Sequence, residues 1–370
     1  MDSIAQELRV SVSALTYDNQ IPYPYELAIG QALFVQEEIR EASRSVQVAG
    51  YAYPFISTWV LEQTLPFLTE LPIFSYGFTG NGDLIPPIWD DERLIALALQ
   101  YGTRPILTLT PFGPDGRFNN NLISSVVNNE TNRTNLIRNL IEVMQKKGYQ
   151  GIDIDFEYIL AEDRDAFTEF VVEVSLQMGA YGYTTSVALA PKTSADQKGL
   201  LYEGKDYAAL GAAVDYVLIM TYEWGYTYGP PMAVAPIHQV RRVVEYAITE
   251  IPPGKILLGI PNYGYDWPLP FERGVTAATT IGNIEAVRIA VEQGASIKFD
   301  EVSQSPFFNY FDFYTGVEHE VWFEDVRSLQ RKFDLIEEFG LRGAGYWQIM
   351  QWFRANWLEL SATFFIGKEG

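Results

Sequence analysis

The chain has 370 residues, with 26 Lys and Arg against 47 Asp and Glu, a formal net charge of −21 and no cysteine. The negative charge argues against nucleic acid or an anionic membrane surface as a partner. The missing cysteines exclude disulfides, thiolate zinc sites and cysteine nucleophiles. The two histidines, His238 and His319, lie far apart in the sequence and neither ends a predicted strand, which argues against a Ser-His-Asp triad. Catalysis should therefore rest on carboxylates and tyrosines.

The sequence predicts neither a membrane-spanning segment nor a metal site. No apolar run reaches about 18 residues, the length that a membrane span needs. Residues 1–30 show no basic segment followed by an apolar one, so no signal peptide is visible. With no cluster of histidines and no cysteines, we expect neither a metal nor a cofactor.

The first 36 residues differ in pattern from those that follow. Helices are predicted at Ser3–Leu8 and Ala14–Asn19, and a strand at Gly30–Val35. The segment resembles a LysM module, a fold that binds N-acetylglucosamine-containing glycans. The stretches that carry the likeness are Ser3-Ile-Ala-Gln, Val12-Ser-Ala-Leu15, Asn19-Gln-Ile and Gly30-Gln-Ala-Leu.

The first strand of a LysM module has no counterpart here, so we interpret residues 1–36 as a truncated LysM-like module. We expect its core to be separate from the rest, so that deleting it would leave turnover of short oligosaccharides nearly unchanged. A bare helical extension is the alternative interpretation. Residues 37–45 are predicted to be a charged connector.

From residue 46 onward, strand and helix patterns alternate. Helices are expected between the strands, for example at Glu92–Tyr101, Tyr207–Val214, Ile237–Ile251 and Ser328–Phe339. The predicted strands are Val46–Tyr53, Pro72–Phe78, Pro105–Thr110, Gly151–Tyr158, Thr184–Ala190, Tyr216–Tyr222, Ile256–Pro261 and Gly343–Ile349. This alternation favours an α/β protein with a parallel (β/α)₈ barrel. A doubly wound open sheet is the alternative, but no Gly-rich phosphate loop follows any strand.

The connection after the seventh predicted strand is too long for a simple barrel loop. Asp266–Asp325 contains a helical pattern at Gly282–Gly294 and short strand-like stretches at Ser296–Phe299 and Val321–Phe323. We predict a small α+β insertion over about residues 266–325, within a barrel domain of residues 46–365.

Acids alternate with large apolar residues in the predicted strand Gly151–Tyr158. Because side chains alternate between faces, Asp153, Asp155 and Glu157 should share one face, about 6–7 Å apart. The helices predicted on both sides of this strand would cover its other face. A fold keeps such a row of carboxylates where the face opens on a polar cavity or the acids share protons. The alternative is an ordinary solvated strand face.

Further candidates lie at the ends of the sixth and eighth predicted strands. Met220 and Tyr222 are two residues apart and should share a face, with Glu223 next in the chain. Trp347 could form an apolar floor for a sugar ring. Catalytic residues of such barrels come from the C-terminal ends of strands, so these side chains should meet.

The acidic stretch resembles the DxxDxDxE signature of glycoside hydrolase family 18, with Gln150 in place of the first Asp. Other stretches that carry the likeness are Ser186–Lys192, Met220–Gly225 and Pro230–Pro236. They look most like the branch of the family that acts on spore-cortex peptidoglycan and carries N-terminal LysM modules. Glu223 stands where many chitinases have Asp.

The resemblance implies a retaining β-N-acetylglucosaminidase that cleaves peptidoglycan by substrate-assisted catalysis. It implies Glu157 as the acid and base, Asp155 and Tyr222 as partners of the substrate's 2-acetamido group, and Asp153 as a partner of Asp155. Met220, Glu223 and Trp347 would bind substrate. A monomer associated with the spore or cell wall, with a glycan as its partner, is expected. Alternatives are a chitinase or endo-N-acetylglucosaminidase acting on chitin-type or N-glycan chains, and a non-catalytic glycan-binding protein.

Overall fold

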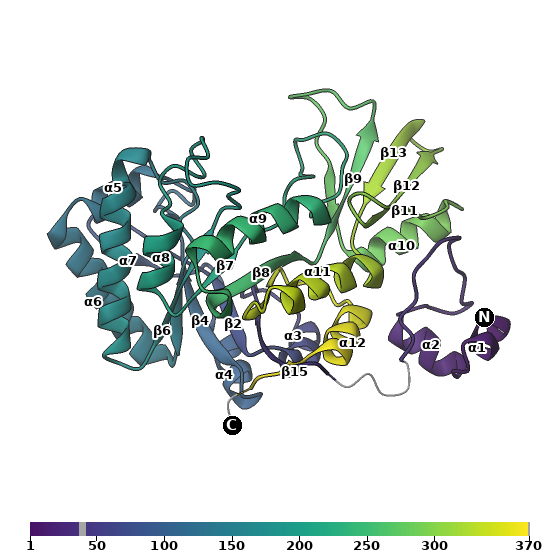
Figure 1. Cartoon of the computed structure of the whole chain (residues 1–370), viewed down its shortest axis with the longest axis horizontal. Coiled ribbons are helices and arrows are strands. Elements are labelled where there is room, and N and C mark those ends of the chain that lie inside the picture. The colour runs from purple at the N-terminus through teal and green to yellow at the C-terminus, as the bar shows by residue number, and fades with distance from the viewer. Residues whose placement is uncertain (37–41, 369–370) are drawn as a thin grey trace.

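A computed structural model describes residues 1–36 and 42–368, and its centre is a closed parallel barrel (Figure 1). Parallel pairing runs from β1 through β14, β8, β7, β6, β5 and β4 to β2, and a further β1–β2 pairing closes the ring. The barrel strands are β1 (Ser45–Gly50), β2 (Glu70–Phe78), β4 (Arg104–Leu109), β5 (Gly151–Ile154), β6 (Thr184–Leu189), β7 (Tyr216–Ile219), β8 (Ile256–Pro261) and β14 (Gly343–Trp347). The predicted (β/α)₈ barrel is therefore confirmed, and the open sheet is excluded.

Helices cover the outside of the barrel. They are α3 (Thr58–Thr64), α4 (Glu92–Gln100), α5 (Asn121–Val127), α6 (Glu130–Lys147), α7 (Arg164–Gly179), α8 (Tyr207–Ala213), α9 (Ile237–Glu250), α11 (Val326–Glu338) and α12 (Arg354–Thr363). Two short strands extend the sheet at its margins, β3 (Leu84–Ile85) beside β2 and β15 (Phe365–Ile366) beside β1.

The packing around β5 explains why the acidic row faces inward. Ile154 and Phe156 are completely buried on the outer side, and the Phe156 ring stacks on Phe170 of α7 with centroids 5.9 Å apart. Asn129 caps α6 by accepting a hydrogen bond from the Asn132 amide, which fixes where that covering helix begins. With the apolar residues committed to the helices, alternation sends the acids to the barrel interior.

Some strands are shorter than predicted on their C-terminal side. Strand β5 ends at Ile154 and β7 at Ile219, so Asp155, Glu157 and Tyr222 lie in the segments that follow. Pairing continues for one residue, since the Asp155 amide donates to the Leu109 carbonyl at 2.9 Å. The chain then leaves the ladder, and this departure places the functional side chains at the mouth of the barrel.

The predicted insertion follows β8 and forms a separate antiparallel sheet beside the barrel (Figure 1). Its strand order is β10-β9-β13-β12-β11. The elements are β9 (Gly264–Leu269), β10 (Thr279–Ile281), α10 (Asn283–Glu292), β11 (Lys298–Asp300), β12 (Ser305–Asp312) and β13 (Val317–Trp322).

The N-terminal segment forms helices α1 (Asp2–Glu7) and α2 (Val12–Asp18), but the strand predicted at Gly30–Val35 is wrong. The Asn19 side chain takes the place of a strand partner there. Its Nδ2 donates to the Phe34 carbonyl at 2.8 Å, and its Oδ1 accepts from the Phe34 amide at 2.6 Å. Most of the predicted connector, residues 37–41, lies outside the described residues.

The N-terminal segment, for which a core separate from the barrel is predicted, contacts both the barrel and the insertion. Phe34 is 5% exposed and belongs to the main hydrophobic core. Arg354 of α12 forms an ion pair with Asp18 at 2.9 Å, and its amide donates to Gln20 Oε1 at 2.6 Å. The Ile297 amide of the insertion donates to the Ile29 carbonyl at 2.8 Å. The segment is docked on both the barrel and the insertion.

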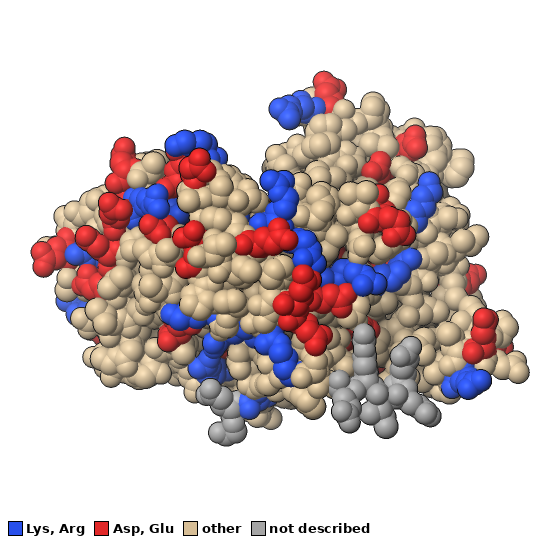
Figure 2. All heavy atoms as spheres, viewed as in Figure 1, with Lys and Arg blue, Asp and Glu red and all other residues tan. Residues whose placement is uncertain are grey.

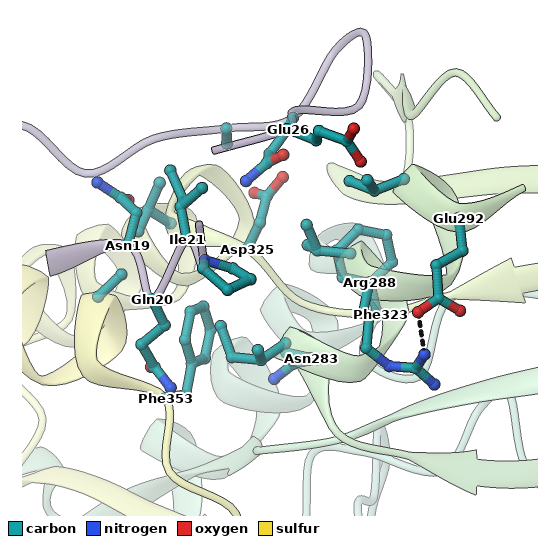
Figure 3. A pocket seen from close by; sticks show the side chains of 18 of the residues that line it. Asn19, Gln20, Ile21, Glu26, Asn283, Arg288, Glu292, Phe323, Asp325 and Phe353 are labelled. Atoms are coloured by element: carbon teal, nitrogen blue, oxygen red, sulfur yellow. Dashed lines mark hydrogen bonds and ion pairs between the residues drawn. The ribbon is translucent and has the colours of Figure 1, made fainter. Parts of the chain in front are cut away.

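A cavity of about 410 Å³ lies along this contact between segment and insertion (Figure 3). Asn19, Gln20 and Ile21 form one side, and Asn283 and Arg288 of α10 lie opposite, as the close view shows. The N-terminal segment thus encloses a hollow against the insertion, while Ala28 packs into the hydrophobic cluster of the insertion.

Truncating Phe34 to alanine should lower the free energy of unfolding by about 3–5 kcal/mol, because a buried phenyl ring is removed from the core. Denaturant unfolding of the purified variant measures this. Phe313→Ala is the matched control, since Phe313 is 84% exposed and its loss should change stability by no more than about 0.5 kcal/mol. Equal stability of the Phe34→Ala variant and the wild-type chain would show that the segment adds nothing to the core.

Charges of both signs are interspersed on the face that Figure 2 shows, although acids outnumber bases in the sequence. Among the described residues, no helix combines the length and apolar character required to cross a membrane.

Candidate active site

A cavity of about 600 Å³ opens at the C-terminal ends of the barrel strands. Its walls come from the ends of β1, β5, β6, β7 and β14 and from the loops that follow β6 and β7. The predicted site residues that line it are Asp155, Glu157, Met220, Tyr222, Glu223 and Trp347. Asp153 lies one layer deeper. Side chains from distant parts of the sequence therefore meet at the strand ends, as predicted.

Asp153 is held rigidly beneath the cavity. Ser186 faces it across the β5–β6 register and donates to Oδ1 at 2.7 Å, while Tyr51 of the β1 end donates to Oδ2 at 2.8 Å. Burial raises the pKa of Asp153 to about 6, although both hydrogen bonds favour the ionised form. Asp153 can therefore change its protonation state near neutral pH.

The pKa of the Asp155 carboxyl group is strongly affected by its surroundings in the site. It is 7% exposed, and its Oδ1 is buried without a hydrogen-bond partner. Burial raises the pKa of Asp155 well above its usual range, and the neighbouring Glu157 and Asp153 raise it further. Lys205 opposes these effects. A buried oxygen without a partner is costly, so this carboxyl group is held in the cavity wall at the expense of stability.

Glu157 and Tyr222 face the cavity from different strands. Glu157 is half-buried and stands above Asp155, following β5, while Tyr222 follows β7 and is 8% exposed. Burial and the surrounding carboxylates raise the pKa of Tyr222 well above its usual range, so its hydroxyl stays protonated and can donate.

Glu223 adopts a left-handed backbone conformation, with φ of 67°, which is uncommon for a residue with a side chain. Tyr263 donates to its Oε1, and Tyr265 of β9 donates to both carboxylate oxygens at 2.9 and 3.1 Å. Glu223 is exposed, yet desolvation by the surrounding protein raises the pKa of its carboxyl. The insertion thus reaches the cavity wall through Tyr265.

The floor of the cavity is aromatic. Trp347 packs edge-on against Phe74 at 5.0 Å and against Tyr51 at 5.7 Å between ring centroids. Met220 lies beside it in the cavity wall. A flat apolar floor beneath a group of carboxyls matches the two faces of a sugar ring, one apolar and one rich in hydroxyls.

The family model of Glycosyl hydrolases family 18 matches residues 113–351, which include the whole acidic row and most of the barrel. The chain belongs to glycosyl hydrolase family 18. It is a glycoside hydrolase, and the expected membership in this family is confirmed.

Relatives within the family share most of the chain. It is 42% identical over 308 residues to the cortical fragment-lytic enzyme of Bacillus subtilis (strain 168), covering 83% of this chain and 70% of that one. It is 40% identical over 335 residues to the enzyme of the same name from Bacillus anthracis, covering 88% and 76%. The crystal structure of the spore cortex-lytic enzyme SleL of Bacillus megaterium QM B1551 superposes with a TM-score of 0.92 at 31% identity, covering 100% of this chain and 96% of that chain.

Three tyrosine and serine side chains that hold the predicted residues of this family 18 hydrolase were not predicted from the sequence. Tyr51 and Ser186 fix Asp153, and Tyr263 fixes Glu223. Tyr51 and Tyr263 follow the ends of β1 and β8, so the strand-end rule could have found them. Lys205 lies in a loop before α8, where no periodic pattern marks it.

Gln150, the departure from the family signature, lies away from the cavity. It is exposed and precedes β5, at the opposite end of the strand from Glu157. Its amide and carbonyl continue the backbone pairing with Pro105 and Thr184.

Proposed function

We propose that this enzyme is a retaining β-N-acetylglucosaminidase that hydrolyses spore-cortex peptidoglycan. The observation that carries the proposal is the inward row of Asp153, Asp155 and Glu157, with Tyr222 facing it across the cavity. The names of relatives at 40% and 42% identity support the cortex as substrate and the spore as location. A chitinase or an endo-N-acetylglucosaminidase acting on N-glycans is the alternative.

Bond cleavage begins with the general acid. Glu157 donates its proton to the glycosidic oxygen, and the leaving sugar departs with that proton. The oxygen of the substrate's own 2-acetamido group attacks the anomeric carbon and closes a five-membered oxazolinium ring, so no side chain forms a bond to the sugar. Family 18 belongs to the substrate-assisted exceptions among retaining hydrolases.

The acetamido group has two proposed partners. The ionised carboxylate of Asp155, which lines the cavity, accepts its N–H and stabilises the positive charge of the ring. Tyr222 donates its hydroxyl hydrogen to the acetamido carbonyl oxygen. Asp153, held by Tyr51 and Ser186, shares charge with Asp155.

Hydrolysis of the intermediate completes the cycle. Glu157, now ionised, takes a proton from a water molecule, whose oxygen opens the ring at the anomeric carbon. Two inversions at that carbon give net retention. Met220, Glu223 and Trp347 position the sugar. The catalytic unit is the barrel of residues 46–365, acting as a monomer, with the insertion at about 266–325 beside the site.

A row of aromatic rings leads outward from Trp347 and fits a polymeric substrate. Tyr53 lies 6.0 Å from Trp347, Phe55 stacks on Tyr53 at 5.2 Å, and Trp89 lies 6.4 Å from Phe55, all between centroids. Phe55 and Trp89 are 56% and 60% exposed. Exposed aromatic rings in sequence can stack on successive sugars of a glycan chain.

Replacing Trp89 by alanine should weaken hydrolysis of polymeric glycan while leaving turnover of short oligosaccharides unchanged. The lost stacking should raise KM for the polymer by about tenfold, equivalent to roughly 1–1.5 kcal/mol. Comparing kcat and KM on both substrates measures this. Leu176→Ala, which removes an apolar side chain that is 72% exposed on α7, is the control. An unchanged KM for polymer would show that the row does not bind glycan.

Digestion of purified cortex peptidoglycan tests the proposed reaction. Mass spectrometry should find N-acetylglucosamine at the new reducing ends, in the β configuration when the product is first released. New reducing ends on muramic acid would refute the proposed bond preference. Efficient cleavage of chitin oligomers with no action on cortex would favour the chitinase alternative.

A further inference from the structure

Lys205 is a fully buried lysine near the carboxylates, and the scheme above gives it no task. It lies in the loop between β6 and α8, and its exposed fraction is 0%. Its Nζ donates a long hydrogen bond, 3.4 Å, to the Ala188 carbonyl. Among the described residues, no carboxylate forms an ion pair with it at contact distance. A buried ammonium with so little compensation is costly to folding.

The loop that carries Lys205 is firmly anchored. The Lys205 carbonyl accepts a hydrogen bond from Lys192 Nζ at 3.0 Å, and its amide donates to the Tyr202 carbonyl at 3.2 Å. The preceding Gly204 packs so closely on the segment after β5 that an added Cβ would lie 2.3 Å from the Ile159 carbonyl oxygen. This close approach holds the lysine against the segment that bears the acids.

The contact of Lys205 with β6 places it beside Asp155. Ile154 and Val187 are the last pair of the β5–β6 register, and Asp155 and Ala188 are the next residues of the two segments. Lys205 therefore reaches the same level of the barrel at which Asp155 Oδ1 is buried without a partner. Asp155 and Glu157 are the charged groups that act on Lys205. Burial lowers the pKa of the Lys205 ammonium to about 8, while both carboxylates oppose that shift.

We propose that Lys205 is a positioning residue whose buried ammonium balances the Asp155–Glu157 pair, so that the pair enters the reaction with one proton and one negative charge. This inference rests on the proposed function and deepens it. Lys205 opposes the effects of burial, Glu157 and Asp153 on the pKa of Asp155, and so favours the ionised Asp155 that must accept the acetamido N–H. Without that charge, the first proton would be lost from the pair only at higher pH.

The charge of Lys205 can be removed in two ways. Lys205→Met leaves an apolar chain of similar length, and Lys205→Gln keeps a hydrogen-bond donor for the Ala188 carbonyl. The pH profile of kcat/KM on a short 2-acetamido substrate is the measurement. Loss of a nearby positive charge raises carboxyl pKa values, so both limbs should move to higher pH by about one unit in both variants.

Stability gives a second measurement that separates charge from structure. Replacing a buried, poorly compensated ammonium by an apolar chain should leave the melting temperature of Lys205→Met unchanged or raise it, while activity at acid pH falls. Lys192→Met is the matched control. It is a buried lysine of the same loop that bonds to the Ala195 and Lys205 carbonyls. Because Lys192→Met removes one anchor of this loop but keeps the Lys205 ammonium, it should lower the melting temperature and shift the two limbs of the pH profile less than the Lys205 variants do.

Three outcomes would overturn the inference. If the acid and alkaline limbs of the kcat/KM profile stay at the same pH in either Lys205 variant, the charge of Lys205 does not act on Asp155 and Glu157. An equal shift in Lys192→Met would trace the effect to the loop. Loss of cooperative unfolding in both Lys205 variants would make the residue structural. Failure of the proposed function would be distinct, because the wild-type enzyme itself would then not cleave 2-acetamido substrates.

Discussion

The Glu157→Gln variant should lose about 10²- to 10⁴-fold in kcat, which is the usual contribution of general acid–base catalysis. Glutamine keeps the shape of the side chain but has no proton to give to the glycosidic oxygen and cannot take one from water. The cavity walls and the Asp153 hydrogen bonds would remain, so binding of glycan should persist. Steady-state kinetics on a short oligosaccharide, with binding measured by calorimetry, tests both parts.

A control substitution distinguishes the effect of removing the general acid from the effect of removing any glutamate charge. Glu162→Gln makes the same chemical change at an exposed position just beyond the site, in the turn before α7, and should leave kcat unaltered. Turnover by Glu157→Gln close to that of the wild-type enzyme would transfer the acid role to another group. Equal losses of kcat and binding would mean that the variant had disturbed the cavity.

The catalytic residues could be predicted from the sequence because their positions follow from local patterns, namely side-chain alternation and the ends of strands. Ile154 and Phe156 are apolar and the residues between them are acidic, so the period of two sends the acids to one side wherever the other side is covered by helices. The strand-end rule then placed Tyr222 and Trp347 with them. Both predictions required only the direction of each strand and the alternation of its side chains, and no distance between strands.

The residues that were missed depend on tertiary contacts. Tyr51 and Asp153 are 102 residues apart and meet across the barrel through a single hydrogen bond. Lys205 is buried by a loop whose path depends on the close approach of Gly204 to Ile159, which no local pattern encodes. The strand wrongly predicted at Gly30–Val35 has a pattern compatible with pairing, but Asn19 occupies the backbone groups of Phe34.

If the substrate supplies the nucleophile, the rate of hydrolysis should fall sharply when its 2-acetamido group is replaced. Substrates of equal length with a 2-hydroxyl or a free 2-amino group lack the attacking oxygen. Their hydrolysis should be too slow to measure beside that of the acetamido substrate. A thiazoline analogue of N-acetylglucosamine, which mimics the closed ring, should inhibit competitively, since such mimics bind about 10²- to 10⁸-fold tighter than substrate.

Tyr222→Phe should lower kcat on acetamido substrates by about 10²- to 10³-fold, the usual loss when one preorganised donor is removed. The raised pKa of Tyr222 keeps its hydroxyl protonated across the working range, so the loss should not vary with pH. Tyr228→Phe makes the same change at a side chain that is 66% exposed and outside the cavity, and should be neutral.

The alternative mechanism, in which a carboxylate is the nucleophile, predicts the opposite results. If Asp153 or Asp155 were the nucleophile, a 2-fluoro sugar would leave a covalent adduct on that residue, detectable by peptide mass, and glucosides would be hydrolysed at comparable rates. Asp153 is a poor candidate on geometry, because Tyr51 and Ser186 occupy both of its oxygens beneath the cavity. Asp155 lines the cavity, so an adduct there is the specific result that would replace the acetamido group as nucleophile.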